Sequence, residues 1–143
     1  MIRPALLLLP LLLAAPAQAQ VRDFSCVGAE QLEGVVLEFP QGRDRAGLDA
    51  LAPLVERAKA EQALNLCVLG FAGAGEGGAE TASRLAARRA RFVAQELAKQ
   101  GVERDRIRAE ARTRGFLDPA RRGGEGGVRR APGVRVVLMP VAG

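Results

Sequence analysis

Apolar and polar positions recur along this chain with two periods, which predict strands and helices in turn. Short apolar runs bounded by turn residues predict strands over 34–39, 64–71 and 134–139. Apolar residues spaced three and four apart predict helices over about 46–59 and 80–100. A further strand is predicted from Ile107, Ala109, Ala111 and Thr113, which alternate with charged Arg108, Glu110, Arg112 and Arg114.

The predicted order is strand, helix, strand, helix, strand, strand. Elements of this number and length fit an α+β two-layer sandwich, βαβαββ, with two helices on one face of a mixed four-stranded sheet. Pro53 lies inside the first helical pattern, so it either ends the first turn or kinks the helix. A long connection that contains the arginine-rich stretch Arg121–Arg130 separates the last two strands.

The first residues have the pattern of a secretory signal peptide rather than of a folded element. Arg3 gives a positive start, residues 6–13 form an apolar run, and Ala17-Gln-Ala19 is a small-x-small cleavage pattern. That run is too short to cross a membrane as a helix, and no later segment is apolar enough to do so. We therefore expect a periplasmic protein with a signal peptide at 1–19, an N-terminal segment at 20–33 and one domain at 34–143, with outer-membrane association left open.

Two cysteines, Cys26 and Cys67, lie in the exported part of the chain. An even pair in an oxidising compartment favours a disulfide. Such a bridge would tie the N-terminal segment to the strand at 64–71 and stabilise the fold by about 4 kcal/mol in the chain-entropy model. The alternative is two separate thiols, with Cys67 filling the core.

The composition narrows the possible functions. The chain has 21 basic and 16 acidic residues, and no histidine. In an exported protein this excess suits anionic partners of the cell envelope rather than nucleic acid, although arginine-rich composition on a solvated surface would look the same. Without a histidine, and without a recognisable base beside any serine, threonine or cysteine, the sequence predicts neither an enzyme nor a metal site.

The loop from Gly73 to Gly78 matches G-x-G-x-x-G between a predicted strand and a predicted helix. That is the local context of a dinucleotide-binding fingerprint. No acidic residue ends a strand about twenty residues later, and Glu76 and Glu80 would repel a phosphate. We interpret the stretch as a flexible loop and expect no cofactor.

One arginine of the second predicted helix lies on the apolar face of that helix rather than on its polar face. Leu85, Ala86, Val93 and Leu97 share one side of the helix, and Arg89 lies four residues from both Leu85 and Val93. A guanidinium on a buried stripe needs a partner, because an unpaired buried charge is very costly. Arg89 is therefore the leading candidate for a binding residue.

Several segments together resemble a known family. The most specific, Leu85-Ala-Ala-Arg-Arg-Ala-Arg-Phe-Val93, is similar to the helix signature L-S-x-x-R-A-x-x-V. Leu69-Gly-Phe71 stands where an apolar strand leads into G-H-T-D, and Arg135-Val-Val-Leu138 resembles a closing R-V-E-I strand. The chain from about Gly34 to Pro140 thus resembles the OmpA-like C-terminal domain, the peptidoglycan-binding module of Gram-negative outer-membrane and periplasmic proteins.

The resemblance implies a ligand and a site. In this family the helix arginine, here Arg89, pairs with the carboxylate of the diaminopimelate side chain in the peptidoglycan stem peptide, and a loop aspartate and loop amides also contact the ligand. Arginine suits this role because its planar fork grips a carboxylate with two hydrogen bonds. Gly73 stands where the aspartate is expected, and Glu76, three residues later, is the candidate to replace it.

Two functions follow from the same expected fold. The first is a periplasmic domain that binds peptidoglycan non-covalently, as an altered and weaker binder. The second is a structural or interaction protein of the envelope, in which Arg89 forms an ion pair with Glu76 or Glu80 and another envelope protein is the partner. The fold resemblance supports both functions, and the missing aspartate favours the second. We expect the first, a weakened or altered wall binder.

Overall fold

The computed structural model describes residues 23–73, 75–112 and 133–141. The regular elements are the strands β1 (Gly34–Glu38), β2 (Leu64–Phe71), β3 (Ile107–Ala111) and β4 (Gly133–Pro140), the helices α1 (Ala52–Ala60) and α2 (Ala79–Lys99), and the short 3-10 turns η1 (Ala29–Gln31), η2 (Asp49–Leu51) and η3 (Arg104–Arg106). The expected signal peptide at 1–19 and the stretch Arg121–Arg130 lie outside the described residues.

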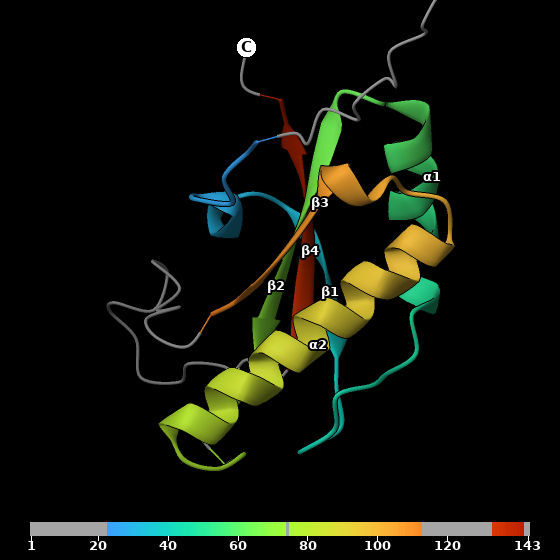
Figure 1. Ribbon diagram of the computed structural model, residues 1–143. Helices are drawn as coiled ribbons and strands as arrows, with labels where there is room; N and C mark the ends of the chain where they lie inside the picture. The colour runs from blue at the N-terminus through green and yellow to red at the C-terminus, as the bar shows by residue number, and fades with distance from the viewer. Residues whose placement is uncertain (1–22, 74, 113–132, 142–143) are drawn as a thin grey trace, which may run out of the picture.

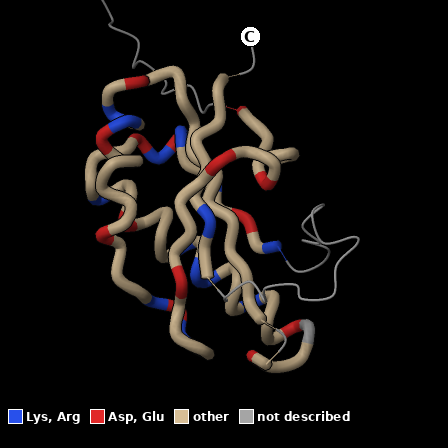
Figure 2. The backbone as a smooth tube through the Cα atoms, turned by 180° about the vertical axis from the view of Figure 1, so that it is seen from behind, with Lys and Arg blue, Asp and Glu red and all other residues tan. Residues whose placement is uncertain are grey.

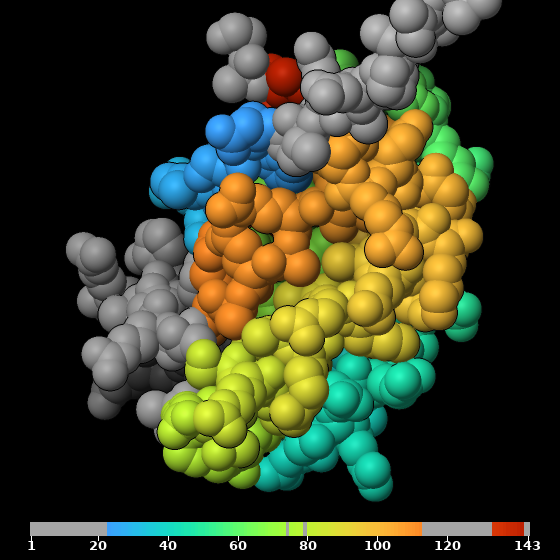
Figure 3. All heavy atoms as spheres, in the orientation of Figure 1, coloured from blue at the N-terminus to red at the C-terminus, as the bar shows by residue number. Residues whose placement is uncertain are grey.

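The four strands form one mixed sheet in the order β1-β4-β2-β3. Strand β4 is antiparallel to both of its neighbours, whereas β2 and β3 are parallel. Both helices lie on one face of the sheet (Figure 1), and α2 forms much of the surface seen from that side (Figure 3). The predicted α+β sandwich is confirmed.

The main core lies between this face of the sheet and the helices. Strand β2 is its centre, because the six residues between Leu64 and Phe71 are all buried. Alternate residues of β2 and β4 point into the helix layer, and α2 meets them with Ala90, Val93 and Leu97, each at most 1% exposed. The helical stripe read from the sequence is therefore the buried face of α2.

Helix α1 begins later than the apolar spacing predicts. Helical geometry starts at Ala52, with η2 before it, so the expected start at about residue 46 is wrong. Pro53 accounts for the difference, because a residue without an N–H fits the first turn of a helix but not its interior. Leu51 lies in the 3-10 turn but is fully buried. Because it is also spaced like the apolar residues of α1, the sequence pattern predicted a longer helix.

The opposite face of the sheet is covered by the N-terminal segment. Cys26 is bonded to Cys67 of β2, with Cα atoms 5.7 Å apart, so the predicted disulfide is confirmed. The bridged cysteines form a second apolar cluster with Ala29, Leu69 and Val137.

Acidic and basic positions are interspersed along the described backbone (Figure 2). Within the described ranges, no helix is both long and apolar enough to cross a bilayer.

Candidate functional site

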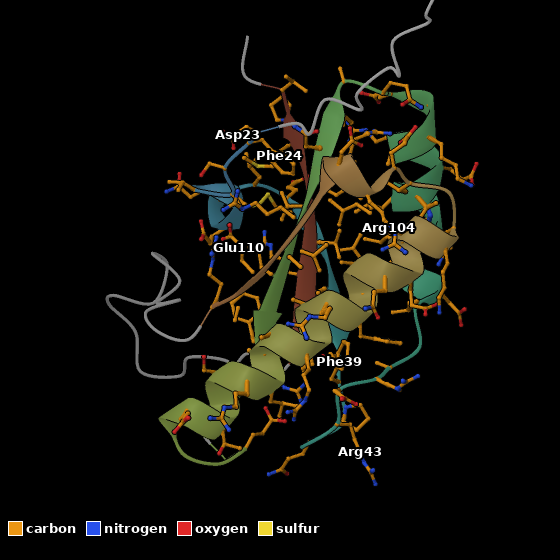
Figure 4. All side chains as sticks on the ribbon, viewed as in Figure 1. Asp23, Phe24, Phe39, Arg43, Arg104 and Glu110 are labelled. Carbon is orange, nitrogen blue, oxygen red and sulfur yellow. A yellow bond between two sulfur atoms is a disulfide. The ribbon has the colours of Figure 1, made fainter. Side chains whose placement is uncertain are left out.

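Arg89 of α2 is completely buried at the end of the sheet where β2 leads into the glycine-rich loop. Its side chain is 0% exposed. The guanidinium carbon lies 5.5 Å from the centre of the Phe39 ring, so the cation also packs over an aromatic face. Figure 4 shows Phe39 beside α2. A charge buried this deeply must be neutralised by nearby groups.

The neutralising group is Glu76, from the loop between β2 and α2. Nη1 of Arg89 donates to Oε2 of Glu76 at 2.8 Å, and Nη2 donates to Oε1. The Glu76 side chain is only 2% exposed. The pair therefore has the two-pronged geometry in which arginine holds a carboxylate most strongly.

Backbone carbonyls occupy the remaining donors of the guanidinium. Nε donates to the oxygen of Arg43 at 2.7 Å, Nη1 to Phe71 at 2.9 Å and Nη2 to Pro40 at 3.3 Å. With the two bonds to Glu76, all five N–H groups of the side chain are used. Arg43 takes part only through its backbone, since its own side chain points away from the body of the protein (Figure 4).

The carboxylate of Glu76 is held by backbone amides as well. The N–H of Gly42 donates to Oε1 at 2.7 Å, and the N–H of Gly73 donates to Oε2 at 2.6 Å. The hydrogen bond from Arg89 lowers the pKa of Glu76 to about 2, against the opposing effect of burial and with help from the two amides. The carboxyl group of Glu76 is therefore ionised at neutral pH.

The donors around Glu76 are arranged to hold a carboxylate group. An arginine and two backbone amides converge on one carboxylate, which together make a site for a carboxylate group. In the part of the chain that the structure describes, no three histidine, cysteine or acidic side chains come together as metal ligands.

The structure brings the three sequence-predicted site residues together. Gly73 contributes an amide, Glu76 the carboxylate and Arg89 the guanidinium. Glu80 does not reach the site, because it pairs with Arg84 on the exposed side of α2. The carbonyls of residues 40, 43 and 71 were missed, since backbone acceptors in loops leave no signal in a sequence pattern.

A second buried arginine also escaped the sequence analysis. Arg106 of η3 is 1% exposed and donates to the backbone oxygens of Ala58, Glu61 and Leu64. Its partners lie around the end of α1, far from Arg89 in the fold. In the sequence, Arg106 comes directly before the alternating strand and is in phase with its charged residues Arg108 and Glu110. The pattern therefore predicted a solvent-exposed side chain.

No family model matches the chain, and no curated protein sequence matches it. Solved structures do match. The peptidoglycan-associated lipoprotein from Burkholderia pseudomallei superposes with a TM-score of 0.55 at 18% identity, over 72% of this chain and 86% of that one. A putative MotB-like protein from Desulfovibrio vulgaris gives 0.56 at 20% identity, over 81% and 83%.

The OmpA-like domain of FopA1 from Francisella tularensis subsp. tularensis gives a TM-score of 0.52 at 18% identity, over 90% of this chain and 94% of that one. These three superpositions confirm at the level of the fold the resemblance read from the sequence.

Proposed function

We propose that this chain, whose fold is that of the OmpA-like domains, is a periplasmic protein that binds peptidoglycan non-covalently through a carboxylate of the stem peptide. The observation that carries the proposal is the bidentate grip of Arg89 on a carboxylate, with amides of Gly42 and Gly73 aimed at the same oxygens. The site thus has the donors that a diaminopimelate carboxylate requires. A matching solved structure is that of a peptidoglycan-associated lipoprotein, which supports this class of ligand.

Binding would proceed by exchange, because Glu76 occupies the position that the ligand would take. The loop that carries Glu76 has glycines at 73, 75, 77 and 78, and Gly77 has a positive φ of 108°. Such a loop can change its backbone conformation at little steric cost. When the ligand carboxylate takes Arg89, the displaced Glu76 is free to pair with an ammonium group of the same ligand. The internal competitor lowers the affinity, as expected of an altered binder.

A second candidate function is supported by the saturation of Arg89. All five of its donors have protein partners, and its side chain is 0% exposed. In that case the ion pair is a structural tie between α2, the loop and the 40–43 turn, and the partner of the domain is another envelope protein. Under this alternative, Glu76 never leaves Arg89.

Retention on purified peptidoglycan sacculi separates the two functions. We expect weak retention of the wild type, stronger retention of Glu76→Gln and none of Arg89→Met. Gln keeps the shape of Glu76 but loses the charge that competes for Arg89. Arg84→Ala, on the exposed side of α2, is the control and should be retained like the wild type.

Because Arg89→Met leaves Glu76 buried without its cation, the double variant Arg89→Met/Glu76→Met accompanies it. Replacing both partners by apolar residues avoids an uncompensated charge. Thermal unfolding reports whether each variant is folded. Failure of both the wild type and Glu76→Gln to bind would overturn the proposal and favour the structural tie. Equal retention of a folded Arg89 double variant would show that the wall is held elsewhere.

A further inference from the structure

Two hollows lie along the exposed side of α2, away from the buried Arg89 site. The larger, of about 250 Å³, is bounded by α2, η3 and β3. Figure 3 shows this hollow between the surface of α2 and the surface of the η3–β3 region. The smaller, of about 140 Å³, lies between α2 and the connection that follows β1. Arg91 and Gln95 line both, so the two hollows adjoin across these side chains, and we call the pair the α2 groove.

The α2 groove has a small apolar floor and basic ends. Its larger part is floored by Ala94, Ala98, Ile107 and Ala109. Arg91 and Arg104 stand over this floor from α2 and η3, and Figure 4 shows Arg104 directed toward the C-terminal half of α2. Arg45 lines the smaller part.

Three arginines of the groove, Arg45, Arg91 and Arg104, have no carboxylate partner among the described residues, whereas a fourth, Arg88, pairs with Asp44. Among the described residues, Arg91 and Arg104 form no ion pair, and Arg45 has only the ring of Phe92, 5.5 Å away. The carboxylate of the groove, Asp44, lies 3.6 Å from Arg88. Glu103, next to Arg104 in the chain, is bonded to Arg106 instead. By contrast, Arg84 on the same helix has its partner in Glu80.

We propose that the α2 groove is a docking site for an acidic segment of a partner protein. Its carboxylates would pair with Arg91 and Arg104, while a small apolar side chain between them would rest on the alanine floor. Arginines suit this task because they bind carboxylates in a fixed planar geometry. The site is independent of peptidoglycan binding, since Arg89 points to the opposite side of α2 and is buried.

The shape of the groove favours a protein segment over an anionic membrane. A bilayer surface is broad and binds best to charges on a flat or convex face, without need of a hollow. Here the basic groups flank a recess whose floor is apolar, as at interfaces where a side chain inserts between charged neighbours. Strand β3 also ends the sheet on this side, and an edge strand is the place where a partner segment can add a strand.

Fluorescence anisotropy with a labelled synthetic peptide of alternating Glu and Ala tests the proposal on the full mature chain. We expect saturable binding that weakens as salt is raised, and none of the matching Gln-Ala peptide. The double variant Arg91→Glu/Arg104→Glu should weaken binding by about tenfold, because two attractive pairs become repulsive. Ala98→Leu, which fills the recess without changing charge, should also weaken it.

Arg84→Glu is the control for one charge reversal on the same helix outside the groove, and it is compared with the single variant Arg91→Glu, because the double variant changes the net charge twice as much. The effect of Arg84→Glu on affinity should be less than about twofold, the size expected of an exposed charge. An equal loss with Arg84→Glu and with Arg91→Glu would show a general charge effect and overturn the proposal. So would sedimentation of the wild type with phosphatidylglycerol vesicles when the Glu-Ala peptide shows no binding.

Discussion

Gly70 of β2 packs directly against the backbone carbonyl of Ala86 in α2. A Cβ atom on Gly70 would lie 2.0 Å from the oxygen of Ala86 and 3.1 Å from the Cβ of Ala90. Non-bonded atoms do not approach to 2.0 Å, so a side chain at Gly70 would force the helix and the sheet apart. The absent side chain thus brings α2 close to the sheet one turn before Arg89, and sets the depth at which that arginine is buried.

We expect Gly70→Ala to lower the free energy of unfolding by about 3 kcal/mol, at the upper end of the range for an overpacked core. The clash is with backbone atoms, which cannot rotate away as a side chain can. Gly47→Ala is the control, because a Cβ there meets nothing within 4 Å. Urea unfolding of the two variants checks the difference. Equal stability of both would mean that α2 can move away from β2 freely.

Acid should weaken the Arg89–Glu76 pair. The pKa of Glu76 falls from an ordinary 4.5 to about 2, chiefly through its hydrogen bond with Arg89. Because the folded pKa is depressed, the stabilisation is complete above about pH 4.5 and is lost as the pH falls toward 2. A shift of this size corresponds to about 3 kcal/mol of unfolding free energy.

Urea unfolding at pH 5.0 and pH 2.5 measures this loss of stability. Other carboxylates also contribute to it, among them Glu110, whose pKa is lowered as well. The variant Glu76→Gln separates the contribution of Glu76 from theirs. The acid-induced loss should be smaller in Glu76→Gln than in the wild type. The control Glu61→Gln removes an exposed partner of Arg57 and should keep the full acid loss. The same acid loss in the wild type and Glu76→Gln would contradict a depressed pKa.

The fold and the buried arginine of the site, Arg89, could be predicted from the sequence because both depend on the spacing of apolar residues. The stripe around Arg89 identified a buried guanidinium before its surroundings were known. Its partner Glu76 was one of several open possibilities, since a loop of four glycines has no period. The carbonyls of Pro40 and Arg43 could not be predicted at all, because they come from a turn 46–49 residues away in the chain.

The disulfide should hold the N-terminal segment on the second face of the sheet. Cys26 and Cys67 close a loop with a sequence separation of 41, and a bridge of that span contributes about 4 kcal/mol in the chain-entropy model. Replacing both cysteines by alanine should therefore lower stability by about that amount and make residues 23–33 sensitive to protease. Modification of both thiols in unfolded, unreduced wild type would contradict the bridge.

Three arginines give the same segment a second set of attachments. Arg108 donates to the oxygen of Phe24 at 2.9 Å, Arg112 to that of Cys26 at 3.2 Å, and Arg135 to that of Leu32. We therefore expect the bridge-free variant to keep its sheet and helices, as measured by circular dichroism. Loss of all regular structure in that variant would show that these bonds cannot hold the segment alone.

Arg106 should matter as much to stability as Arg89. Its Nη2 donates to the oxygens of Ala58 at 2.6 Å and Glu61 at 3.0 Å, which lie at the end of α1. Its Nε donates to Leu64 at the start of β2, so one side chain joins the helix to the sheet. Arg106→Met would remove the donor that these carbonyls share, although the oxygen of Glu61 keeps the N–H of Leu64 at 3.0 Å, and should cost about 3 kcal/mol.

Arg106→Lys should recover only part of that loss, because a single ammonium cannot reproduce a planar fork that reaches several carbonyls at once. Arg104→Ala is the control from the same 3-10 turn, and its exposed side chain should be worth less than about 0.5 kcal/mol. Thermal unfolding of the three variants checks the order. If Arg106→Lys were as stable as the wild type, a positive charge alone would be sufficient at this position. That outcome would contradict the role of the planar guanidinium.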